Sequence, residues 1–583
     1  MTTSTGAGPI QPERAAGAET PATPDTPVPA AVAPSGGASS GGASSGGGGP
    51  VGDFTHAQVL TILSGLLLGM FLAALDQTIV STSIRTIADD LQGLSQQAWV
   101  TTAYLITGTI TTPIFGKLGD IYGRKRLFMF AITIFVAGSA LCSFATSMTS
   151  LAAFRAIQGL GAGGLIPLVL AIIGDIVSPR ERAKYTGYFM ATFGASSVLG
   201  PLVGGFLAGR DEIAGIAGWR WVFLVNVPVG LVAFVVVSRT LRLPATRRRG
   251  VRIDWWGAAF LAITLVPLLT VAEQGRSWGW LSGRSATAYA IGALGLLGFV
   301  LIERRLGDAA LIPPRLFRIR AAAVTIAASM AVGVAMFGGI MLLPLYLQIV
   351  HGASPTESGL LMLPMVVGMM LASITSGRMI ARTGHVRMFP IVGSAMATVA
   401  LLLLSLVSAD TDLRVVMVPM FLLGLGLGQC MQPLLLTVQS AVPPSEIGMA
   451  TSSATFFRQI GGTIGVAALL SVLFGTLGGN ITTAFSDAAA KDPDVAAAMA
   501  SPEVERALDT VADDSSVIER LDPEIAHPIK VGFSESMDRV FLIAAGAGLV
   551  AFLILLLMPA VRLRDTSAMA AARAAVPAEE REG

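Results

Sequence analysis

The sequence predicts an all-α membrane protein with fourteen transmembrane helices, arranged as two six-helix bundles with two extra helices between them. Three observations support this fold class. Of the 583 residues, 53% are hydrophobic and 13% are charged, and the charged share is about half that of an ordinary soluble domain. The apolar residues form fourteen long segments, and features of the first half recur at a nearly constant spacing in the second half.

Residues 1–54, before the first apolar segment, are predicted to be a disordered cytoplasmic tail. They are rich in Pro, Thr, Ala, Gly and Ser, a composition that cannot form an apolar core. No basic region followed by an apolar stretch occurs there, so we do not expect a cleaved signal peptide.

The apolar segments are about as long as the roughly 20 residues that a helix needs to cross a membrane. We place the first six-helix bundle in residues 55–241, a linker with two extra transmembrane helices in 242–320, and five helices of the second bundle in 321–475. The last span, 538–560, completes that bundle and precedes a cytoplasmic tail, 561–583. The predicted spans are residues 59–83, 96–116, 127–146, 150–174, 184–208, 219–241, 255–273, 285–303, 322–349, 356–380, 387–408, 414–439, 447–475 and 538–560.

Residues 476–537 are predicted to be an extracytoplasmic loop. The segment contains many Asp and Glu residues, alanine-rich stretches that favour helix, and four prolines that interrupt it. We therefore expect short helices outside the membrane. The loop could be a solvated connector or a lid over the outer mouth.

Basic residues in the short loops predict the orientation, because they favour the cytoplasmic side. Connections after even-numbered spans contain runs of basic residues, at 124–126, 247–249 and 304–305, whereas the opposite short loops contain isolated cations such as Arg85. Both termini are therefore expected in the cytoplasm, and the protein in the cytoplasmic (inner) membrane.

The connection between the second and third predicted spans, residues 116–126, is rich in glycine and in charge, and we call it the hinge. Gly116 and Gly123 permit two helices to reverse direction tightly, and Asp120 lies among four cations. This composition predicts a moving cytoplasmic gate. The cations are Lys117, Arg124, Lys125 and Arg126.

The hinge has a counterpart 261 positions later, at residues 377–387. The counterpart keeps both glycines and the basic character, but Ala381 stands at the position of Asp120. Glycines and cations therefore shape the turn in both halves, and Asp120 is the hinge residue that we expect to act as a latch.

A spacing of 265 residues relates further positions in the two halves. Gly163 corresponds to Gly428, whereas Arg155 corresponds to Met420, so the charge is present in the first half only. Repeated halves around a central site allow many secondary transporters to alternate access by rocking one bundle against the other.

Asp76, Arg155 and Arg458 fall inside predicted spans, where a charge at the centre costs about 2.5–3.5 kcal/mol. Asp76 could bind and release a proton, because burial favours a neutral carboxyl and a nearby cation favours the carboxylate. It could also be a structural carboxylate bound by Thr78 or by a neighbouring helix.

Arg155 cannot lose its proton, so in lipid it needs an anion or a carbonyl as partner. It could couple protonation to movement, or it could only join helices through Gln158 and backbone carbonyls. For Arg458 and Gln158 we consider a structural role or a place on the substrate path, and we favour the structural role for Arg458.

The predicted fifth span contains Gly200, Pro201, Gly204 and Gly205. Because proline removes a helix hydrogen bond and glycine permits close packing, we expect a kink in this helix. Packing alone is a sufficient reason for such a kink.

Several function classes find no support in the sequence. It contains no Gly-x4-Gly-Lys-Ser/Thr loop for a nucleotide, no catalytic triad or paired catalytic carboxylates, and no metal-ligand spacing among its four histidines and two cysteines. The net charge of +2 gives no support for nucleic-acid binding. We therefore expect no enzyme activity, no cofactor and no metal, and energy from an ion gradient.

Four motifs resemble the major facilitator superfamily, and within it the fourteen-span drug:proton antiporters. The hinge is similar to the family's motif between spans two and three, although Ile121 replaces its usual arginine. Residues 151–161 look like the span-four motif, residues 200–205 like the span-five motif of exporters, and residues 75–91 like the span-one signature. Departures from these motifs are Ser196 for glycine in span five, and Ser81 and Arg85 for asparagine and proline in span one.

The resemblance implies the major facilitator fold and assigns roles to the motif residues. Asp120 and the hinge cations would latch the cytoplasmic side in one state and release it in the other. Asp76 and Arg155 would couple transport to protons, and the span-five motif would favour antiport over symport.

We therefore predict a proton-driven antiporter that exports amphiphilic drugs or antibiotics by alternating access, and we expect a monomer. Because acidic residues are scarce in the spans, we expect little dependence on multiply cationic substrates. One alternative is an exporter of one endogenous product, such as a lipid, a siderophore or a self-made antibiotic. Another is a membrane sensor that has lost transport, which intact Asp76, Arg155 and Asp120 argue against.

Overall fold

The computed structural model describes residues 56–92, 96–182, 185–241, 254–490, 521–561 and 563. Within these residues the chain is helical apart from turns and one short hairpin of two antiparallel strands, β1 (Glu212–Ile213) and β2 (Ile216–Ala217). The predicted all-α class is confirmed. The two predicted tails, residues 1–54 and 561–583, lie outside the described residues, except for residues 561 and 563.

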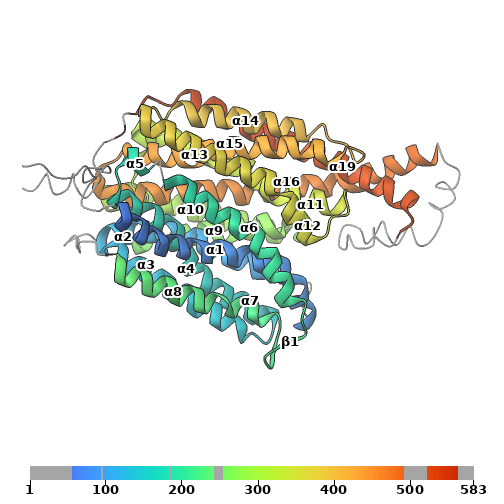
Figure 1. Ribbon diagram of the computed structural model, residues 1–583, viewed down its shortest axis with the longest axis horizontal. Helices are drawn as coiled ribbons and strands as arrows, with labels where there is room; N and C mark the ends of the chain where they lie inside the picture. The colour runs from blue at the N-terminus through green and yellow to red at the C-terminus, as the bar shows by residue number, and fades with distance from the viewer. Residues whose placement is uncertain are drawn as a thin grey trace, which may run out of the picture. The chain divides into compact units, whose positions relative to one another are not determined.

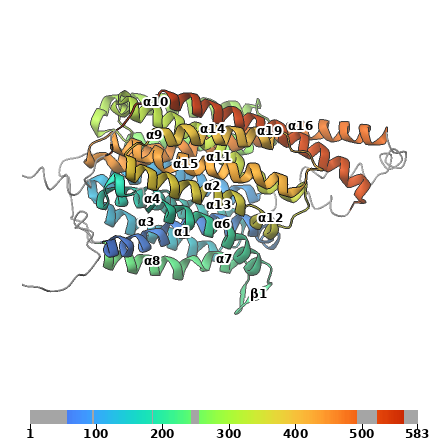
Figure 2. The same ribbon diagram turned by 45° about the horizontal axis from the view of Figure 1, so that its top comes forward.

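The first bundle forms from seven helices, of which α7 and α8 together occupy one predicted span (Figures 1 and 2). A short helix, α5 (Pro179–Arg182), precedes α6. The strands β1 and β2 lie between α6 and α7. The helices are α1 (His56–Asp90), α2 (Gln97–Tyr122), α3 (Arg124–Ser143), α4 (Met148–Ile176), α6 (Thr186–Ala208), α7 (Arg220–Leu224) and α8 (Asn226–Thr240).

The second bundle likewise contains one span that is divided between two helices, α12 and α13. Two 3-10 turns, η3 (Gly307–Ala309) and η4 (Pro314–Arg318), precede this bundle, and η5 (Pro444–Glu446) lies within it. The helices are α11 (Arg320–Ile349), α12 (Pro355–Leu361), α13 (Leu363–Thr383), α14 (Met388–Leu404), α15 (Leu413–Ser440), α16 (Ile447–Ala489) and α19 (Pro523–Leu556).

The two extra helices, α9 (Trp255–Trp278) and α10 (Gly283–Leu306), form a hairpin that packs beside both bundles. Leu261 and Leu265 of α9 share an apolar cluster with Ile106 of α2 and Phe456 of α16. The two extra helices therefore pack at the junction between α2 and α16.

Every predicted span coincides with a helix or a helix pair. Among the described residues, twelve helices are long and apolar enough to cross a membrane. Of the other two expected spans, α14 is a shorter apolar helix of 17 residues. The other, α2, has six threonines among its 26 residues, which lower its mean hydropathy. Thr107, Thr111 and Thr112 donate hydrogen bonds to backbone oxygens of their own helix, whereas the buried Thr102 hydroxyl has no partner among the described residues.

The segment predicted as an outer loop, residues 476–537, is helical at both ends. Helix α16 continues to Ala489, and α19 begins at Pro523 instead of near 538. Leu477, Ile481 and Phe485 of α16 are buried together with Phe533 and Met537 of α19. The sequence interpretation weighted the acids and prolines of this segment and missed this apolar pairing, and residues 491–520 lie outside the described residues.

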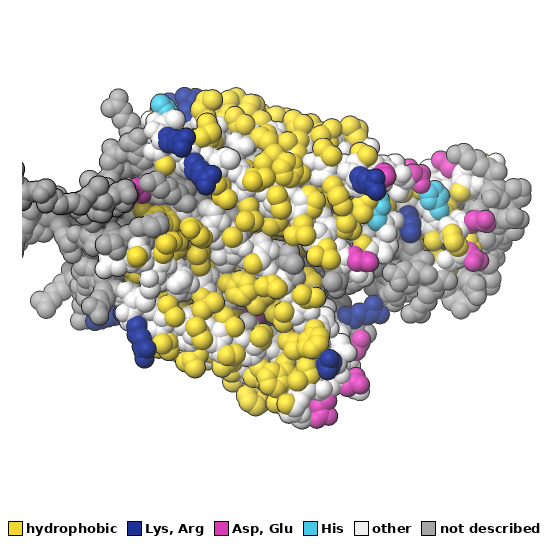
Figure 3. All heavy atoms as spheres, viewed as in Figure 1, with side chains coloured by type: hydrophobic (Ala, Val, Ile, Leu, Met, Phe, Trp, Pro, Cys, Tyr) yellow, Lys and Arg dark blue, Asp and Glu magenta, His cyan; other side chains and the backbone are white. Residues whose placement is uncertain are grey.

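Apolar side chains cover the middle of the face drawn in Figure 3, with cations at both ends. Phe130, Leu202, Leu231 and Leu294 are each more than half exposed. Exposed apolar surface of this extent is unfavourable in water and is typical of a membrane-embedded protein. The protein is therefore a multi-pass membrane protein.

The internal repeat is present in three dimensions. A Cβ at Gly163 would collide with the backbone oxygen of Gly108, and one at Gly428 would collide with that of Met369, so α4 and α15 each pack on a neighbouring helix in the same way. The segments 116–126 and 377–387 each reverse direction at a glycine with positive φ, Gly123 (φ +94°, ψ 131°) and Gly384 (φ +72°, ψ 0°), although the different ψ angles make the two turns unlike in detail. Gly116, which the sequence placed in the turn, lies inside α2. We call the end of the bundles that contains these two turns the hinge end.

Candidate functional site

A fully buried polar cluster surrounds Asp76 in the first bundle. Arg155 Nη1 donates to Asp76 Oδ2 at 2.6 Å. Gln158 Nε2 and Asn226 Nδ2 donate to the other carboxylate oxygen at 2.9 and 2.8 Å. The carboxylate therefore accepts three hydrogen bonds from three different side chains.

Arg155 is held by more than its ion pair. Its Nη1 also donates to Gln158 Oε1 at 2.8 Å, and its Nε lies 3.5 Å from the oxygen of Val100. The guanidinium carbon lies 4.0 Å from the centre of the Tyr104 ring, a cation–π arrangement. Arg155 is 1% exposed, so each of these contacts acts without competition from water.

Local sequence explains how these side chains meet. Arg155 and Gln158 are three residues apart on α4 and so lie on one face of that helix. Gly159 brings α4 close to α2, because a Cβ there would collide with Thr107 Oγ1. Gly138 allows α3 to approach the backbone of Gln158 closely.

Sequence reasoning missed Asn226 and Tyr104, which complete the cluster. Asn226 begins α8 and also donates to Ser139 Oγ at 3.0 Å. It is the single amide side chain in the apolar stretch 221–237, and that isolation could have indicated its role. Asn226 Oδ1 and the Tyr104 hydroxyl are buried without a hydrogen-bond partner among the described residues.

The structure places Thr78 away from the Asp76 carboxylate. Its hydroxyl donates to the backbone oxygens of Leu75, at 2.9 Å, and Ser196, at 3.0 Å. Neighbouring helices, and not Thr78, therefore bind Asp76.

A second cluster lies at the hinge end, around Asp120. Arg124 Nη2 donates to Asp120 Oδ1 at 2.9 Å, and Arg124 Nη1 lies 2.9 Å from Asp175 Oδ1. Arg124 Nη1 also donates to the oxygen of Ala171 in α4. Arg124 and Asp120 side chains are 6% and 8% exposed, so this ion pair is poorly screened by solvent.

Asp120 also contacts the second bundle. Its Oδ2 accepts the backbone N–H of Met449, at 2.8 Å, in the first turn of α16. An anion at a helix N-terminus is favoured by the unpaired N–H groups and by the helix dipole. Gly448 permits this approach, because a Cβ there would collide with the Asp120 carboxylate, and Gly116 likewise packs against Ser452.

The hinge cations differ in what they contact. Lys117 Nζ donates to the oxygen of Asp308, after the extra helices, at 3.0 Å. Lys125 Nζ donates to the oxygen of Ser238 in α8 at 2.7 Å. Arg126 is exposed and has no partner among the described residues.

A further contact between the bundles lies beside the hinge. Arg182 of α5 donates to Gln439 Oε1 of α15 and to the oxygen of Gly174, the latter at 3.0 Å. Burial lowers the pKa of Arg182 to about 9, while Asp175 acts in the opposite direction, and the side chain remains charged at neutral pH. Gln439 in turn donates to Thr451 Oγ1 at 2.8 Å.

The span-five glycines divide into two groups. Gly200 and Gly204 face α1, where a Cβ would collide with Thr78 Oγ1 and Thr82 Oγ1 respectively. Gly205 is exposed, and nothing lies within 4 Å of the place of a Cβ. Pro201 lies inside α6, which continues to Ala208.

Arg458 lies on α16 of the second bundle and joins neither cluster. In the part of the chain that the structure describes, no group of three or more His, Cys, Asp or Glu side chains could hold a metal ion.

The fold contains two related helical bundles, a buried ion pair in one of them, and a charged contact across the junction between them. This arrangement is typical of secondary membrane transporters. Comparison with known proteins agrees. The chain belongs to the Major Facilitator Superfamily, whose sequence model matches residues 66–466.

Curated relatives include multidrug transporters. Multidrug transporter protein MdtP of Bacillus subtilis (strain 168) is 35% identical over 424 residues, which are 72% of this chain and 76% of that protein. Multidrug resistance protein 3 of the same organism is 32% identical over 520 residues, 88% and 98% of the two chains. An uncharacterized MFS-type transporter of Mycobacterium tuberculosis (strain ATCC 25618 / H37Rv) is 35% identical over 519 residues, 89% and 72% of the two chains.

Solved structures share the fold. The proton:xylose symporter XylE matches with a TM-score of 0.56 at 14% identity, over 88% of this chain and 98% of that chain. At this identity the likeness concerns the fold alone, and it confirms the predicted major facilitator architecture.

Proposed function

We propose that the protein is a proton-coupled antiporter that exports amphiphilic drugs or antibiotics across the cytoplasmic membrane by alternating access. It acts as a monomer, with both termini and the hinge end facing the cytoplasm. The observation that carries this proposal is the buried pair of Asp76 and Arg155. The names of the Bacillus relatives support multidrug compounds as the substrate class.

The pair can act as a proton switch because its two members respond differently to protons. A proton on Asp76 removes the negative charge that Arg155 faces, while Arg155 keeps its own charge. A buried cation without a counter-charge is strongly unfavourable. The protonated carboxyl also becomes a donor, and the unpaired Asn226 Oδ1 is an available acceptor for it. Protonation therefore favours a different arrangement of α1, α4 and α8.

Helix α4 connects the switch to the hinge. Arg155 lies near its start, and Ala171 and Asp175, which contact Arg124, lie near its end. Sixteen residues of α-helix separate Arg155 from Ala171, which corresponds to about 24 Å. A rigid helix that is bound at both ends transmits a displacement from Asp76 to Asp120.

The contact between Asp120 and Met449 fastens the two bundles at the cytoplasmic side in the present state. Release of this contact would let the bundles separate there, so that substrate enters from the cytoplasm or the inner leaflet. Return of the latch, together with the contact of Arg182 and Gln439, closes that side. The binding of a proton and the binding of substrate then alternate, as antiport requires.

The experiment is dye transport in everted membrane vesicles under an imposed pH gradient. Wild-type vesicles with an acidic lumen should accumulate an amphiphilic fluorescent dye, and Asp76→Asn should abolish this accumulation because the switch can no longer titrate. Asp76→Glu, which keeps a titratable carboxyl, is the matched control and should retain part of the activity. Absence of gradient-driven uptake in wild type, or full uptake by Asp76→Asn, would contradict the proposal.

A further inference from the structure

Arg458 is a cation inside a membrane-spanning helix that neither cluster uses. It is half-buried. Among the described residues no carboxylate forms an ion pair with it, and its guanidinium donates no hydrogen bond to a described acceptor. Because a charge in a membrane span is costly, an ionisable residue there is by default a functional candidate.

The side chain of Arg458 points away from the lipid-facing stripe of α16. Arg458 shares its helical face with Thr451, Thr455 and Gly462, since spacings of seven, three and four residues bring side chains onto one face. Those three residues are buried. The exposed residues of this part of the helix, such as Ile464, lie on a different face. Arg458 is therefore directed into the protein.

The guanidinium is unpaired but not enclosed. Atoms that are both buried and unpaired among the described residues belong to other side chains, such as Arg182 and Asn226. The nitrogens of Arg458 are therefore not fully enclosed by protein. Its five N–H donors, which have no partner among the described residues, form a planar fork that can bind a carboxylate, sulfonate or phosphate group.

The charge balance of the spans favours an anion over a cation. Asp76 is neutralised by Arg155 at 2.6 Å, so this pair presents no net charge to a substrate. Arg458 adds one positive charge that no described carboxylate balances. A cationic substrate would be repelled by this group, and an anionic one would be attracted.

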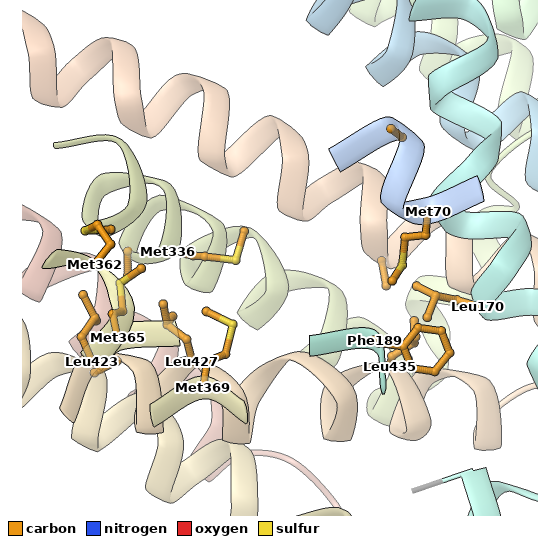
Figure 4. Close-up of a cluster of buried hydrophobic side chains, with 14 of the residues drawn as sticks. Met70, Leu170, Phe189, Met336, Met362, Met365, Met369, Leu423, Leu427 and Leu435 are labelled. Atoms are coloured by element: carbon orange, nitrogen blue, oxygen red, sulfur yellow. The ribbon is translucent and has the colours of Figure 1, made fainter. Parts of the chain in front are cut away.

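A group of buried methionines includes one on α11, the helix that packs against the backbone of Arg458. Gly333 of α11 packs so closely on α16 that a Cβ there would collide with the backbone oxygen of Arg458. Met336 follows one turn later on α11 and faces methionines of α13 (Figure 4). Methionine is flexible and polarisable and suits apolar groups of varied shape. The methionines of this group are Met336, Met362, Met365 and Met369.

We infer that Arg458 is the anion-binding group of the substrate path, and that the protein recognises monoanionic amphiphiles with a carboxylate, sulfonate or phosphate head and an apolar body. This inference rests on the proposed export function and names the substrate class of the same path. The head group would pair with the guanidinium, and the apolar body would lie toward the methionine group. The anion would also supply the counter-charge that Arg458 lacks.

The test is equilibrium binding of matched probes to the full chain in nanodiscs of phosphatidylcholine. Pyrenebutyrate, pyrenebutanol and pyrenebutyl-trimethylammonium share one apolar body and differ in charge. Wild type should bind the anion about tenfold more tightly than the alcohol, as expected for a hydrogen bond to a charged group, and should bind the cation most weakly. Arg458→Gln should remove this preference and leave the affinity for the alcohol unchanged.

Two further variants control for loss of the fold and for general charge effects. Arg458→Lys keeps the charge and should keep part of the anion preference. Arg414→Gln removes an exposed cation at the start of α15 and should have no effect. Equal affinity of wild type for the anion and the alcohol, no binding of the anion, or a preference that survives Arg458→Gln would overturn the inference.

Failure of this inference and failure of the proposed function give different results. Asp76→Asn should lose gradient-driven transport in vesicles while its anion preference in nanodiscs persists. If wild type showed an Arg458-dependent preference for the anion but no gradient-driven transport, the proposed function would be wrong and the anion site would remain. Phosphatidylglycerol in the nanodisc separates two sources of ligand: displacement of pyrenebutyrate would identify a lipid head group, and no displacement would identify a free amphiphile.

Discussion

The two bundles have the same scaffold but different chemistry. Gly163 and Gly428 make equivalent close contacts, and Gly123 and Gly384 both have positive φ where the chain reverses direction. The ionisable groups do not repeat. Met420, which is fully buried, stands where the first bundle has Arg155, and Ala381 stands where it has Asp120. The repeat therefore preserves packing and reversal of direction, while one copy contains the buried ion pair and the latch.

This difference indicates that the two bundles have different roles in transport. A proton switch needs a buried carboxylate with a permanent cation, and a second such pair would add the cost of burying two more charges. The second bundle instead supplies the N-terminus of α16, which contacts Asp120, and Arg458, which has no charge partner among the described residues. The first bundle would sense protons, and the second would receive the latch and the substrate.

The largest effect should follow from Arg155→Met, which gives the first bundle the residue of its repeat. The change leaves Asp76 buried without its cation, so we expect a loss of about 3–5 kcal/mol of stability and no transport. Thermal unfolding in detergent measures the stability. The double variant Asp76→Leu/Arg155→Met removes both charges and should recover most of the stability but no transport. A single variant as stable as wild type would show that the ion pair has no structural role.

A smaller effect is expected from Asp120→Asn. The amide keeps the size of the side chain but loses the charge that pairs with Arg124 and binds the first turn of α16, so gradient-driven dye transport should fall by about tenfold, as for loss of a charged hydrogen bond. Arg126→Gln removes an exposed hinge cation and should change transport little. If Arg126→Gln impaired transport as much as Asp120→Asn, the latch assignment would be wrong.

The smallest effects should come from the shared scaffold, and they should be alike in the two bundles. Gly163→Ala and Gly428→Ala each force a methyl group against a backbone oxygen, and overpacking of this kind costs about 1–3 kcal/mol. Unfolding temperatures of the two variants should fall by similar amounts. A large drop for one and none for the other would contradict the structural equivalence of the bundles.

The transmembrane helices could be predicted from the sequence, and so could the two charged residues of the Asp76 cluster. Long apolar segments reveal spans because every backbone group in lipid must be paired within a helix, so the predicted spans coincide with helices. The parts of α16 and α19 beyond the predicted spans were missed because Ile481 and Phe533, which are buried in one cluster, lie far apart in the sequence. A charge inside a span stands out in sequence, and Asp76 and Arg155 were found in this way.

Contacts through backbone groups could not be predicted. Asp120 accepts the N–H of Met449, which lies 329 residues away, and any residue but proline offers such a donor. The glycine that admits Asp120, Gly448, is one of 66 glycines in the chain and has no motif to mark it. Asn226 was missed because one amide in an apolar span is a weaker signal than a charge.

Proton counting during substrate binding tests most directly whether the first bundle contains the proton switch. The purified protein in weakly buffered detergent solution is mixed with a transported dye, and the pH change is followed with an indicator. Wild type should release a proton as the dye binds, in proportion to the protein present, and Asp76→Asn should bind the dye without release. Undiminished proton release from Asp76→Asn would place the switch elsewhere and contradict the account.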